Sequence, residues 1–177
     1  MLKGKTTGLR AIERGDLGQL LKWRNNPDFR KFFREHRELS HTNQENWFQS
    51  RVLPADKDIM FAIESLTDGS LLGACGLCHI NSLYRSADVS IYIGKDDLYI
   101  DTVHAPETVA ILIKYAFEEL NMHRLYAEIY DIDTAKKAFF PQMGFKLEGR
   151  QRDAYWHGGK WIDSLFFSLL SHEYFNA

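Results

Sequence analysis

Apolar side chains recur along the chain at two different spacings, and each spacing predicts one kind of element. Alternation of apolar and polar positions over 87–93 is typical of a strand. Compact apolar runs at 59–63 and 71–80, separated by the turn dipeptide Asp68-Gly69, predict a hairpin. The remaining strands are expected at 9–12 and 124–130, with a last hairpin that pairs 145–155 with 161–170 across His157-Gly158-Gly159.

Spacings of three and four residues predict helices instead. The clearest helix begins near Pro106, which suits a first helical turn, and keeps its apolar residues on one face through Leu120. Three shorter helices are expected: one capped by Asp16 and ended by Pro27, one opened by the capping box Thr42-Asn-Gln-Glu45, and one from Asp133 to Met143 that stops at Gly144. Strands precede a strand-helix-strand-helix-strand order, so the fold class is an α/β or α+β sandwich.

Composition limits the classes of protein and partner. The chain has 177 residues, 45% hydrophobic and 26% charged, which is enough for one packed core, and we expect a single domain over 1–177. Its 22 basic and 24 acidic side chains give a net charge of -2, so neither nucleic acid nor a membrane is an expected partner. No apolar run approaches the roughly 18–20 residues of a membrane span, and the N-terminus lacks the apolar stretch of a secretion signal. A cytoplasmic protein is expected.

The segment Cys75-Gly-Leu-Cys78-His79 has the spacing of a haem-attachment motif, and its first four residues have that of a redox or half-zinc motif. Covalent haem needs an exported chain, and tetrahedral zinc needs four ligands, whereas this chain has no second cysteine pair. Side chains three apart in a strand point to opposite faces, so the two sulfurs should diverge. We interpret both cysteines as small core residues and expect no metal.

Five segments together resemble one enzyme family. They are Tyr115-Ala-Phe-Glu-Glu-Leu-Asn-Met-His-Arg124, Met143-Gly-Phe-Lys-Leu-Glu-Gly-Arg150, Asp163 to Glu173, Lys22-Trp-Arg-Asn-Asn-Pro27 and Ile80-Asn-Ser-Leu-Tyr-Arg-Ser-Ala-Asp-Val89. In this order and spacing they resemble the GNAT acetyltransferase superfamily, in the branch that acetylates ribosomal-protein N-termini, polyamines and nucleotide-linked amino sugars. The resemblance implies a GNAT-like sandwich: a mixed, mostly antiparallel sheet with a splayed central parallel strand pair and helices on both faces.

The resemblance also implies where the acetyl donor, acetyl-CoA, binds. The central parallel strands should part after Ile93 and Tyr130, leaving a wedge for the pantetheine arm. The backbone groups that would face this arm belong to Ile91, Tyr92 and Ile93, and a backbone N–H there would stabilise the developing oxyanion. The pyrophosphate would rest on the loop and helix N-terminus formed by Thr102, Val103, His104 and Ala105, because unpaired N–H groups and the helix dipole favour anions.

Three positions depart from the family pattern. The coenzyme loop has no glycine, β-branched Val103 resists the positive φ that glycine would allow, and Asp101 adds negative charge near an anionic ligand. Phe140 stands where many relatives have a tyrosine that protonates the leaving thiolate, and water or Tyr130 could supply that proton instead. Asp133 replaces an asparagine that contacts the coenzyme amide, and it serves either that contact or the N-cap of its helix.

An acceptor amine has to lose a proton, which requires a carboxylate or a histidine near the cleft. By the resemblance, Asp88 is the first choice for this base and His79, on the neighbouring strand, is the second. Asp88 could equally be a solvated residue at a strand end. Arg24 and Asn25 match the region that contacts the acceptor in this branch, with surface capping as the alternative.

The expected function is acetyl-CoA-dependent N-acetylation of a primary amine on a small molecule, with a nucleotide-linked amino sugar as the leading acceptor. A protein N-terminus or a polyamine is the alternative acceptor. A GNAT-fold binding module without catalysis is the alternative from another class, because Val103 and Phe140 both depart from the pattern. Trp23 and Trp47 are interpreted as core residues rather than platforms for a sugar. A monomer or a homodimer is expected.

Overall fold

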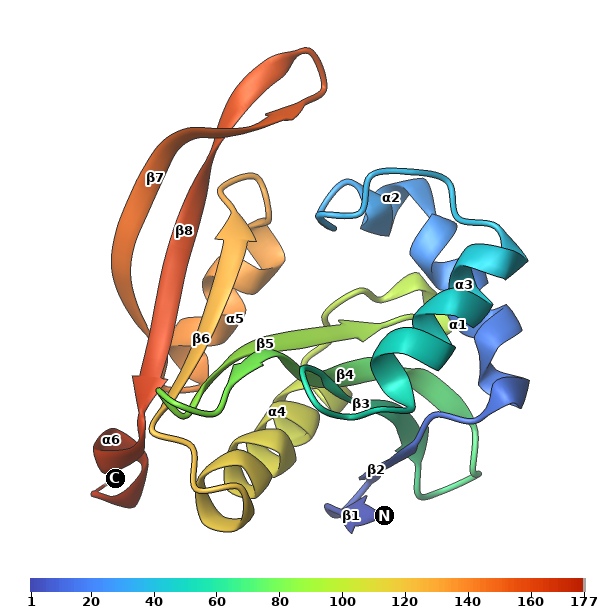
Figure 1. Cartoon of the computed structure of the whole chain (residues 1–177), viewed down its shortest axis with the longest axis horizontal. Helices are drawn as coiled ribbons and strands as arrows, with labels where there is room; N and C mark the ends of the chain where they lie inside the picture. The colour runs from blue at the N-terminus through green and yellow to red at the C-terminus, as the bar shows by residue number, and fades with distance from the viewer. Residues whose placement is uncertain (177) are drawn as a thin grey trace.

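A computed structural model describes residues 1–176 and arranges eight strands of this range in one mixed sheet (Figure 1). The strand order is β1-β2-β3-β4-β5-β6-β8-β7, and every neighbouring pair is antiparallel except β5 and β6. The strands are β1 (Leu2–Lys3), β2 (Thr7–Ala11), β3 (Ile59–Ser65), β4 (Leu71–Asn81), β5 (Ser86–Ile93), β6 (Arg124–Tyr130), β7 (Lys146–His157) and β8 (Lys160–Leu170). This sheet confirms the expected fold class and both hairpins.

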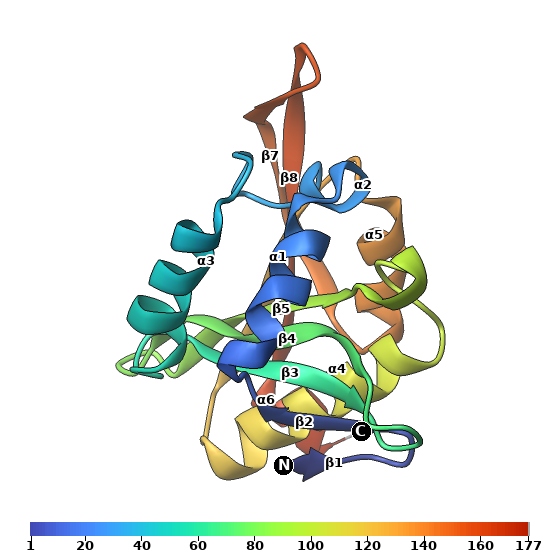
Figure 2. The same cartoon turned by 90° about the vertical axis from the view of Figure 1, so that its right-hand side faces the viewer.

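Helices cover both faces of the sheet (Figures 1 and 2). One face carries α1 (Leu17–Asn25), α2 (Pro27–Arg30) and α3 (His41–Trp47), and the other carries α4 (His104–Lys114) and α5 (Thr134–Gln142). Helices α3 and α4 continue into π-helical turns at Phe48–Val52 and Tyr115–Glu119, and α6 (Ser171–Phe175) follows β8. Within residues 1–176, no helix has the length and apolarity needed to cross a membrane.

Strand β5 separates two hydrophobic cores, because successive strand residues point to opposite faces. Its odd-numbered residues from Ala87 to Ile93 pack in the larger core with α4 and α5. The even-numbered residues therefore face the side of α1 and α3, where Tyr92 joins the smaller core. Asp88 belongs to this second face, so the sheet presents its carboxylate to the helices of the N-terminal third.

The parallel strands β5 and β6 separate earlier than the sequence predicts. They pair only from Ser86 to Asp88 on β5 and from Arg124 to Tyr126 on β6, whereas separation was expected after Ile93 and Tyr130. The reason lies in their other neighbours: β5 stays paired with β4 up to Ile93, and β6 stays paired with β8 up to Tyr130. The two halves of the sheet diverge with their own partners, as Figure 1 shows. The resulting wedge is longer than expected.

Some helix starts differ from the predictions. Helix α3 is capped by Ser40 rather than Thr42: the Ser40 hydroxyl accepts a hydrogen bond from the Asn43 N–H (3.1 Å), and the Asn43 amide oxygen accepts one from the Ser40 N–H (3.0 Å). Asp16 precedes α1, but its carboxylate binds Arg10 (2.7 Å) instead of capping the helix. The start of α3 therefore moves because Ser40 and Asn43 cap each other, whereas α1 begins at Leu17 as expected and lacks only the capping hydrogen bond.

The two cysteines have different surroundings, as the three-residue spacing predicts. Cys75 is buried in the larger core, whereas Cys78 is half-buried and its sulfur lies 3.6 Å from the Met60 sulfur. Both are free thiols. Burial raises the pKa of Cys78 to about 12, so this thiol stays protonated near neutral pH.

Glu107, in the first turn of α4, ties the chain between β1 and β2 to the helix. Its Oε2 accepts hydrogen bonds from the Thr6 hydroxyl (2.5 Å) and the Thr7 hydroxyl (2.7 Å), and the carboxylate also accepts from the Lys5 N–H. Burial favours the neutral acid, but these hydrogen bonds outweigh it and lower the pKa of Glu107 from 4.5 to about 2.

We therefore expect Glu107→Gln to reduce the free energy of unfolding at pH 7. A carboxyl whose pKa is lower in the folded chain stabilises the fold above its unfolded pKa and loses that effect as the pH falls through the folded value. The difference in the free energy of unfolding between wild type and variant should reach its full size above pH 4.5 and vanish toward pH 2. Urea unfolding across this range measures it, and a difference that stays constant with pH would contradict the assignment.

Candidate active site

The point where β5 and β6 separate carries three charged side chains in contact. Asp88, the last paired residue of β5, is 6% exposed, and its Oδ2 lies 3.1 Å from Nη1 of Arg34. Nη2 of Arg34 lies 2.8 Å from Oε2 of Glu128 on β6, so one guanidinium joins the two diverging strands. Burial raises the pKa of Asp88, and the charge of Arg34 opposes this rise without cancelling it. A buried carboxylate with a raised pKa is suited to accept a proton from an amine.

The alternative base, His79, lies at an irregular part of β4. Its residue has a φ of 52°, in the left-handed region, and its backbone N–H donates to Oδ1 of Asp58 (3.0 Å). The side chain is exposed, yet its charge lowers the pKa of Asp88, so the two groups lie near one another. Of the two candidates, Asp88 is the one that the fold withdraws from water.

A cavity of about 400 Å³ lies on the face covered by α1 and α3, the face of β5 to which Asp88 belongs. Ser90, two residues further along β5, lines it, and so does Cys78, which pairs across the sheet with Asp88. Trp47 of α3 is half-buried: it packs against the smaller core, in line with the core prediction, and it also lines the cavity. Trp23 is buried as expected. We call this space the acceptor cavity.

Arg24 is the only charged side chain lining the acceptor cavity that has no opposite charge beside it within residues 1–176. Its guanidinium carbon lies 4.1 Å from the centre of the Phe33 ring, and no carboxylate comes within 4.0 Å of its nitrogens. The other charged lining residues form two ion pairs, Arg37 with Glu35 (2.7 Å) and Arg51 with Asp58 (2.5 Å). Burial lowers the pKa of Arg24, and the charge of Glu35, whose carboxylate is paired with Arg37, opposes this fall without cancelling it. The cavity therefore carries one uncompensated positive charge.

The side chain of Asn25, the neighbour of Arg24, forms hydrogen bonds with the backbone. Its amide oxygen accepts from the Leu39 N–H (2.9 Å), and its amide nitrogen donates to the Leu39 carbonyl (2.8 Å). This double contact fixes the segment before α3, which includes Glu35 and Arg37 beside the cavity. In this arrangement Asn25 positions Leu39, which lines the acceptor cavity, while Arg24 lines the cavity directly.

The residues expected at the pantetheine arm divide between the two sides of β5. The Ile93 N–H points to the wedge and donates to the Tyr99 carbonyl (2.7 Å), and Ile91 shares this edge because alternate backbone groups face the same neighbour. The Tyr92 carbonyl instead lies next to Gly73 on β4. The free stretch of β5 edge facing the wedge is therefore centred on Ile91.

The mouth of the wedge is crossed by a buried hydrogen bond from Tyr99 to Asp133. The Tyr99 hydroxyl donates to Oδ2 of Asp133 (2.6 Å), while Oδ1 of Asp133 accepts from the Lys136 N–H (2.9 Å) as the N-cap of α5. Asp133 thus performs the capping role, and its second oxygen holds Tyr99. Phe140 is 1% exposed and packs against the rings of Phe139, Phe145 and Phe167.

The N-terminus of α4 is occupied by a carboxylate of the chain itself. Asp101 accepts hydrogen bonds from the His104 N–H (3.0 Å) and the Ala105 N–H (2.7 Å). Val103 has a φ of -113° and is exposed, so the loop does not require the left-handed conformation that its β-branched side chain would resist. Thr102 lies in the same exposed turn. The obstacle to an anionic ligand here is Asp101 rather than Val103.

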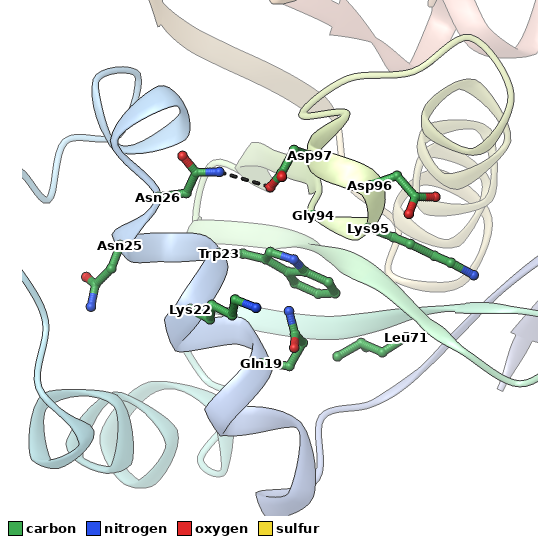
Figure 3. A pocket seen from close by; sticks show the side chains of 10 residues that line it. All are labelled: Gln19, Lys22, Trp23, Asn25, Asn26, Leu71, Gly94, Lys95, Asp96 and Asp97. Atoms are coloured by element: carbon green, nitrogen blue, oxygen red, sulfur yellow. Dashed lines mark hydrogen bonds between the residues drawn. The ribbon is translucent and has the colours of Figure 1, made fainter.

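A second, more open depression of about 740 Å³ lies between α1 and the turn after β5 (Figure 3). The Asn26 amide donates to Oδ1 of Asp97 (3.0 Å) across it, and Gly94 packs so closely on Trp23 that an added Cβ would lie 2.0 Å from the indole. Lys22, Lys95, Asp96 and Asp97 balance in charge around it. The contacts around this depression hold α1 against the end of β5. The acceptor cavity remains the candidate site.

A mixed sheet whose central parallel strands diverge, with a buried carboxylate where they part and a cavity on the same face, is an arrangement that could place an acyl donor beside an acceptor. The model of the acetyltransferase (GNAT) domain family matches residues 9–166. The chain belongs to the GNAT acetyltransferase family, whose members use acetyl-CoA as the donor.

The relatives of this chain are N-acetyltransferases. It is 24% identical over 168 residues to a spermidine N(1)-acetyltransferase from Vibrio cholerae, covering 95% of each chain. It is 33% identical over 110 residues to a putative ribosomal N-acetyltransferase from Bacillus subtilis, covering 62% of this chain and 58% of that one. The crystal structure of the Vibrio cholerae spermidine N-acetyltransferase in complex with CoA and spermine has a TM-score of 0.88, at 24% identity, over 98% of this chain and 100% of that one.

The chain's own residues fit one part of coenzyme A directly. The free edge of β5 at Ile91 suits the amide groups of a pantetheine arm, which can pair with a strand edge as a peptide does. At the other end, the N–H groups of α4 that would receive the pyrophosphate already bind Asp101. Admission of the phosphates therefore requires that Asp101 be displaced or neutralised.

We expect Asp101→Asn to tighten the binding of CoA about fivefold. Asparagine still caps a helix, but it removes a negative charge from the position where the phosphates would approach. Isothermal titration with CoA measures the change, and Asp97→Asn is the matched control, since Asp97 contacts Asn26 and not the helix N-terminus. Unchanged or weaker CoA binding in Asp101→Asn would show that the phosphates bind elsewhere.

Four side chains of this region escaped the sequence analysis: Arg34, Tyr99, Glu128 and Lys136. Arg34 and Tyr99 lie in irregular segments, where periodicity carries no information about direction. Glu128 does occupy a polar position between apolar residues of β6, and this alternation could have indicated that it shares a face with Tyr126 and Tyr130.

Proposed function

We propose that this protein transfers the acetyl group of acetyl-CoA to the primary amine of a nucleotide-linked amino sugar. The proposal rests on the uncompensated positive charge of Arg24 in the acceptor cavity. An acceptor that carries a phosphate or carboxylate can pair with this guanidinium, which presents several donors in a planar fork. The half-buried ring of Trp47 offers an apolar surface beside it for a base or a sugar.

The same charge argues against a polyamine as the acceptor. The relative from Vibrio cholerae is a spermidine acetyltransferase, and spermidine is a polycation. Here the carboxylates that line the cavity, Glu35 and Asp58, are already paired with arginines, which leaves Arg24 to repel a second cation. A cationic acceptor would have to enter a cavity whose lining carries a net positive charge.

Asp88 is the proposed base. Its carboxylate takes the proton from the acceptor nitrogen, and Arg34 holds this carboxylate in place through the contact with Oδ2 at 3.1 Å. Glu128 fixes the other side of the guanidinium, and it is itself held by the Tyr155 hydroxyl (2.8 Å) and the Ser164 hydroxyl (2.6 Å). When bound, acetyl-CoA supplies the activated acyl group, and the backbone of Ile91 would hold its pantetheine arm.

A panel of acceptors tests the proposal with the purified protein and acetyl-CoA. Nucleotide-linked amino sugars, spermidine and a peptide with a free N-terminus are compared by release of free thiol. The expected result is a kcat/KM about 10²-fold higher for the nucleotide-linked amine, since one buried ionic contact is worth roughly 2–5 kcal/mol. Faster acetylation of spermidine or of the peptide would contradict this assignment of the acceptor.

A binding module without catalysis is the second candidate, favoured by the contacts that fill the coenzyme site. Tyr99 crosses the wedge to Asp133, and Asp101 occupies the N–H groups of α4. A ligand that binds the folded chain raises its melting temperature. An unchanged melting temperature at millimolar CoA would favour this module over the enzyme.

We propose that the protein is a monomer or a homodimer in solution, which light scattering would test.

A further inference from the structure

The ammonium group of Lys136 lies at the mouth of the wedge and has no part in the proposed proton transfer to Asp88. Lys136 lies in the first turn of α5, and its Nζ lies over the Tyr99 ring, 5.1 Å from the ring centre. Tyr99 marks the mouth of the wedge and Asp88 its apex, and the charges that act on Lys136 include Asp88. The ammonium therefore lies beside Tyr99, at the mouth of the wedge.

The surroundings of Lys136 hold it as a cation that can release a proton. Within residues 1–176 no carboxylate forms an ion pair with its Nζ, because Asp133 uses its oxygens for the Tyr99 hydroxyl and the α5 cap. Burial lowers the pKa of Lys136, Asp133 and Asp88 raise it, and Arg24 and Arg34 lower it further. The face of the Tyr99 ring favours the charged form.

Lys136 also lies one helical turn before Phe140. Residues four apart share a face of a helix, but the Phe140 ring packs in the larger core, whereas Nζ of Lys136 lies over Tyr99 of the smaller core. The Phe140 ring is 1% exposed and carries no proton to give. The chain thus lacks an acid at 140 and supplies an ammonium from the adjacent turn.

Resting on the proposed acetyl transfer, we infer that Lys136 is the catalytic acid that protonates the leaving sulfur of the donor. As the carbon–nitrogen bond forms, the acceptor nitrogen loses its proton to Asp88. As the carbon–sulfur bond breaks, the sulfur keeps the electron pair and takes a proton from Nζ of Lys136. Asp88 then releases its proton to water and Lys136 regains one, so the charges of both residues return to their starting state.

The pKa of the bound CoA thiol tests this assignment without turnover. The probe is CoA itself, titrated in complex with the protein and followed by the ultraviolet absorbance of its thiolate. A nearby ammonium favours the thiolate, so Lys136→Met should raise the thiol pKa by about one unit relative to wild type. Lys137→Met is the matched control. Lys137 lies on the same helix as Lys136, but it pairs with Asp131 (2.5 Å), so its loss should leave the thiol pKa unchanged.

Turnover then separates proton donation from the effect of charge alone. Lys136→Met should lower kcat about tenfold, with KM for the acceptor little changed, since a thiolate is already a fair leaving group. Lys136→Arg keeps the charge but cannot give up a proton at neutral pH, so it should keep the low thiol pKa and still lose kcat. In wild type, kcat should fall as the pH rises through the pKa of Lys136, and this decline should be absent in Lys136→Met.

The outcomes distinguish the inference from the function on which it rests. Wild-type acetylation together with an unchanged thiol pKa in Lys136→Met overturns the role of Lys136 and leaves the acetyltransferase intact. Full activity of Lys136→Arg overturns proton donation. Failure of the wild-type protein to bind CoA at all overturns the inference and the proposed enzyme together.

Discussion

Asp88→Asn should lower kcat by about 10³-fold while leaving the affinity for CoA within twofold. Asparagine has nearly the same shape but cannot accept the acceptor's proton, and general base catalysis contributes roughly 10²–10⁴-fold. Burial raises the pKa of Asp88, so kcat/KM of the wild type should fall as the pH drops through that pKa and the base becomes protonated. The acidic limb of the pH profile should disappear in the variant.

The matched control for Asp88→Asn removes the other carboxylate that contacts Arg34. Glu128→Gln takes away the partner at 2.8 Å and leaves Asp88 with its own contact to the same guanidinium. We expect a loss of kcat below tenfold, because this variant disturbs the position of the base but not the base itself. An equal loss in both variants would mean that the charge network, rather than proton transfer at Asp88, supports activity.

Arg24→Gln should raise KM for a nucleotide-linked amine about 10²-fold and leave kcat nearly unchanged. A buried guanidinium paired with a phosphate is worth roughly 2–5 kcal/mol, and an interaction present equally in the bound substrate and the transition state appears in KM. The melting temperature of the free protein should stay within about 2 °C, since the variant removes a partly desolvated cation that has no carboxylate partner in residues 1–176.

Arg37→Gln is the control for Arg24→Gln. Both residues line the acceptor cavity, but Arg37 is paired with Glu35 through Nη2 and Oε2 at 2.7 Å. We expect less than a threefold change in KM, because an exposed, paired charge contributes little. If the two variants weaken the binding of the acceptor equally, the total charge of the cavity selects the acceptor and Arg24 has no special role. If neither does, an anionic acceptor is the wrong class.

The secondary structure of the central sheet could be predicted because its signals are local. The strand expected at 124–130 is found as Arg124–Tyr130, and the one expected at 87–93 as Ser86–Ile93. Alternation and turn chemistry specify which residues share a face, so they also indicate that Asp88 lies opposite the larger core. The short elements at the ends, β1 and α6, have too few residues to leave such a pattern.

The contacts of the candidate site could not be predicted, because they join residues that no periodic pattern relates. Arg34 reaches Asp88 across 54 positions of sequence, and the same guanidinium reaches Glu128 across 94. The direction of a long side chain in an irregular segment depends on what it packs against. Nothing in the local sequence indicates that Tyr99 turns toward Asp133 or that the Lys136 ammonium lies over the Tyr99 ring.

The amino-acid sequence by itself determined the order of the longer strands and helices, the family and the candidate carboxylate at position 88, because periodicity, turn residues and family motifs are all properties of nearby residues. Only the tertiary structure decided where the central strands part, which cavity cation lacks an ion-pair partner in residues 1–176 and which groups of the chain bind at the positions expected for the coenzyme. These depend on distances between elements that the sheet brings together, and electrostatic energies change steeply with such distances and with burial.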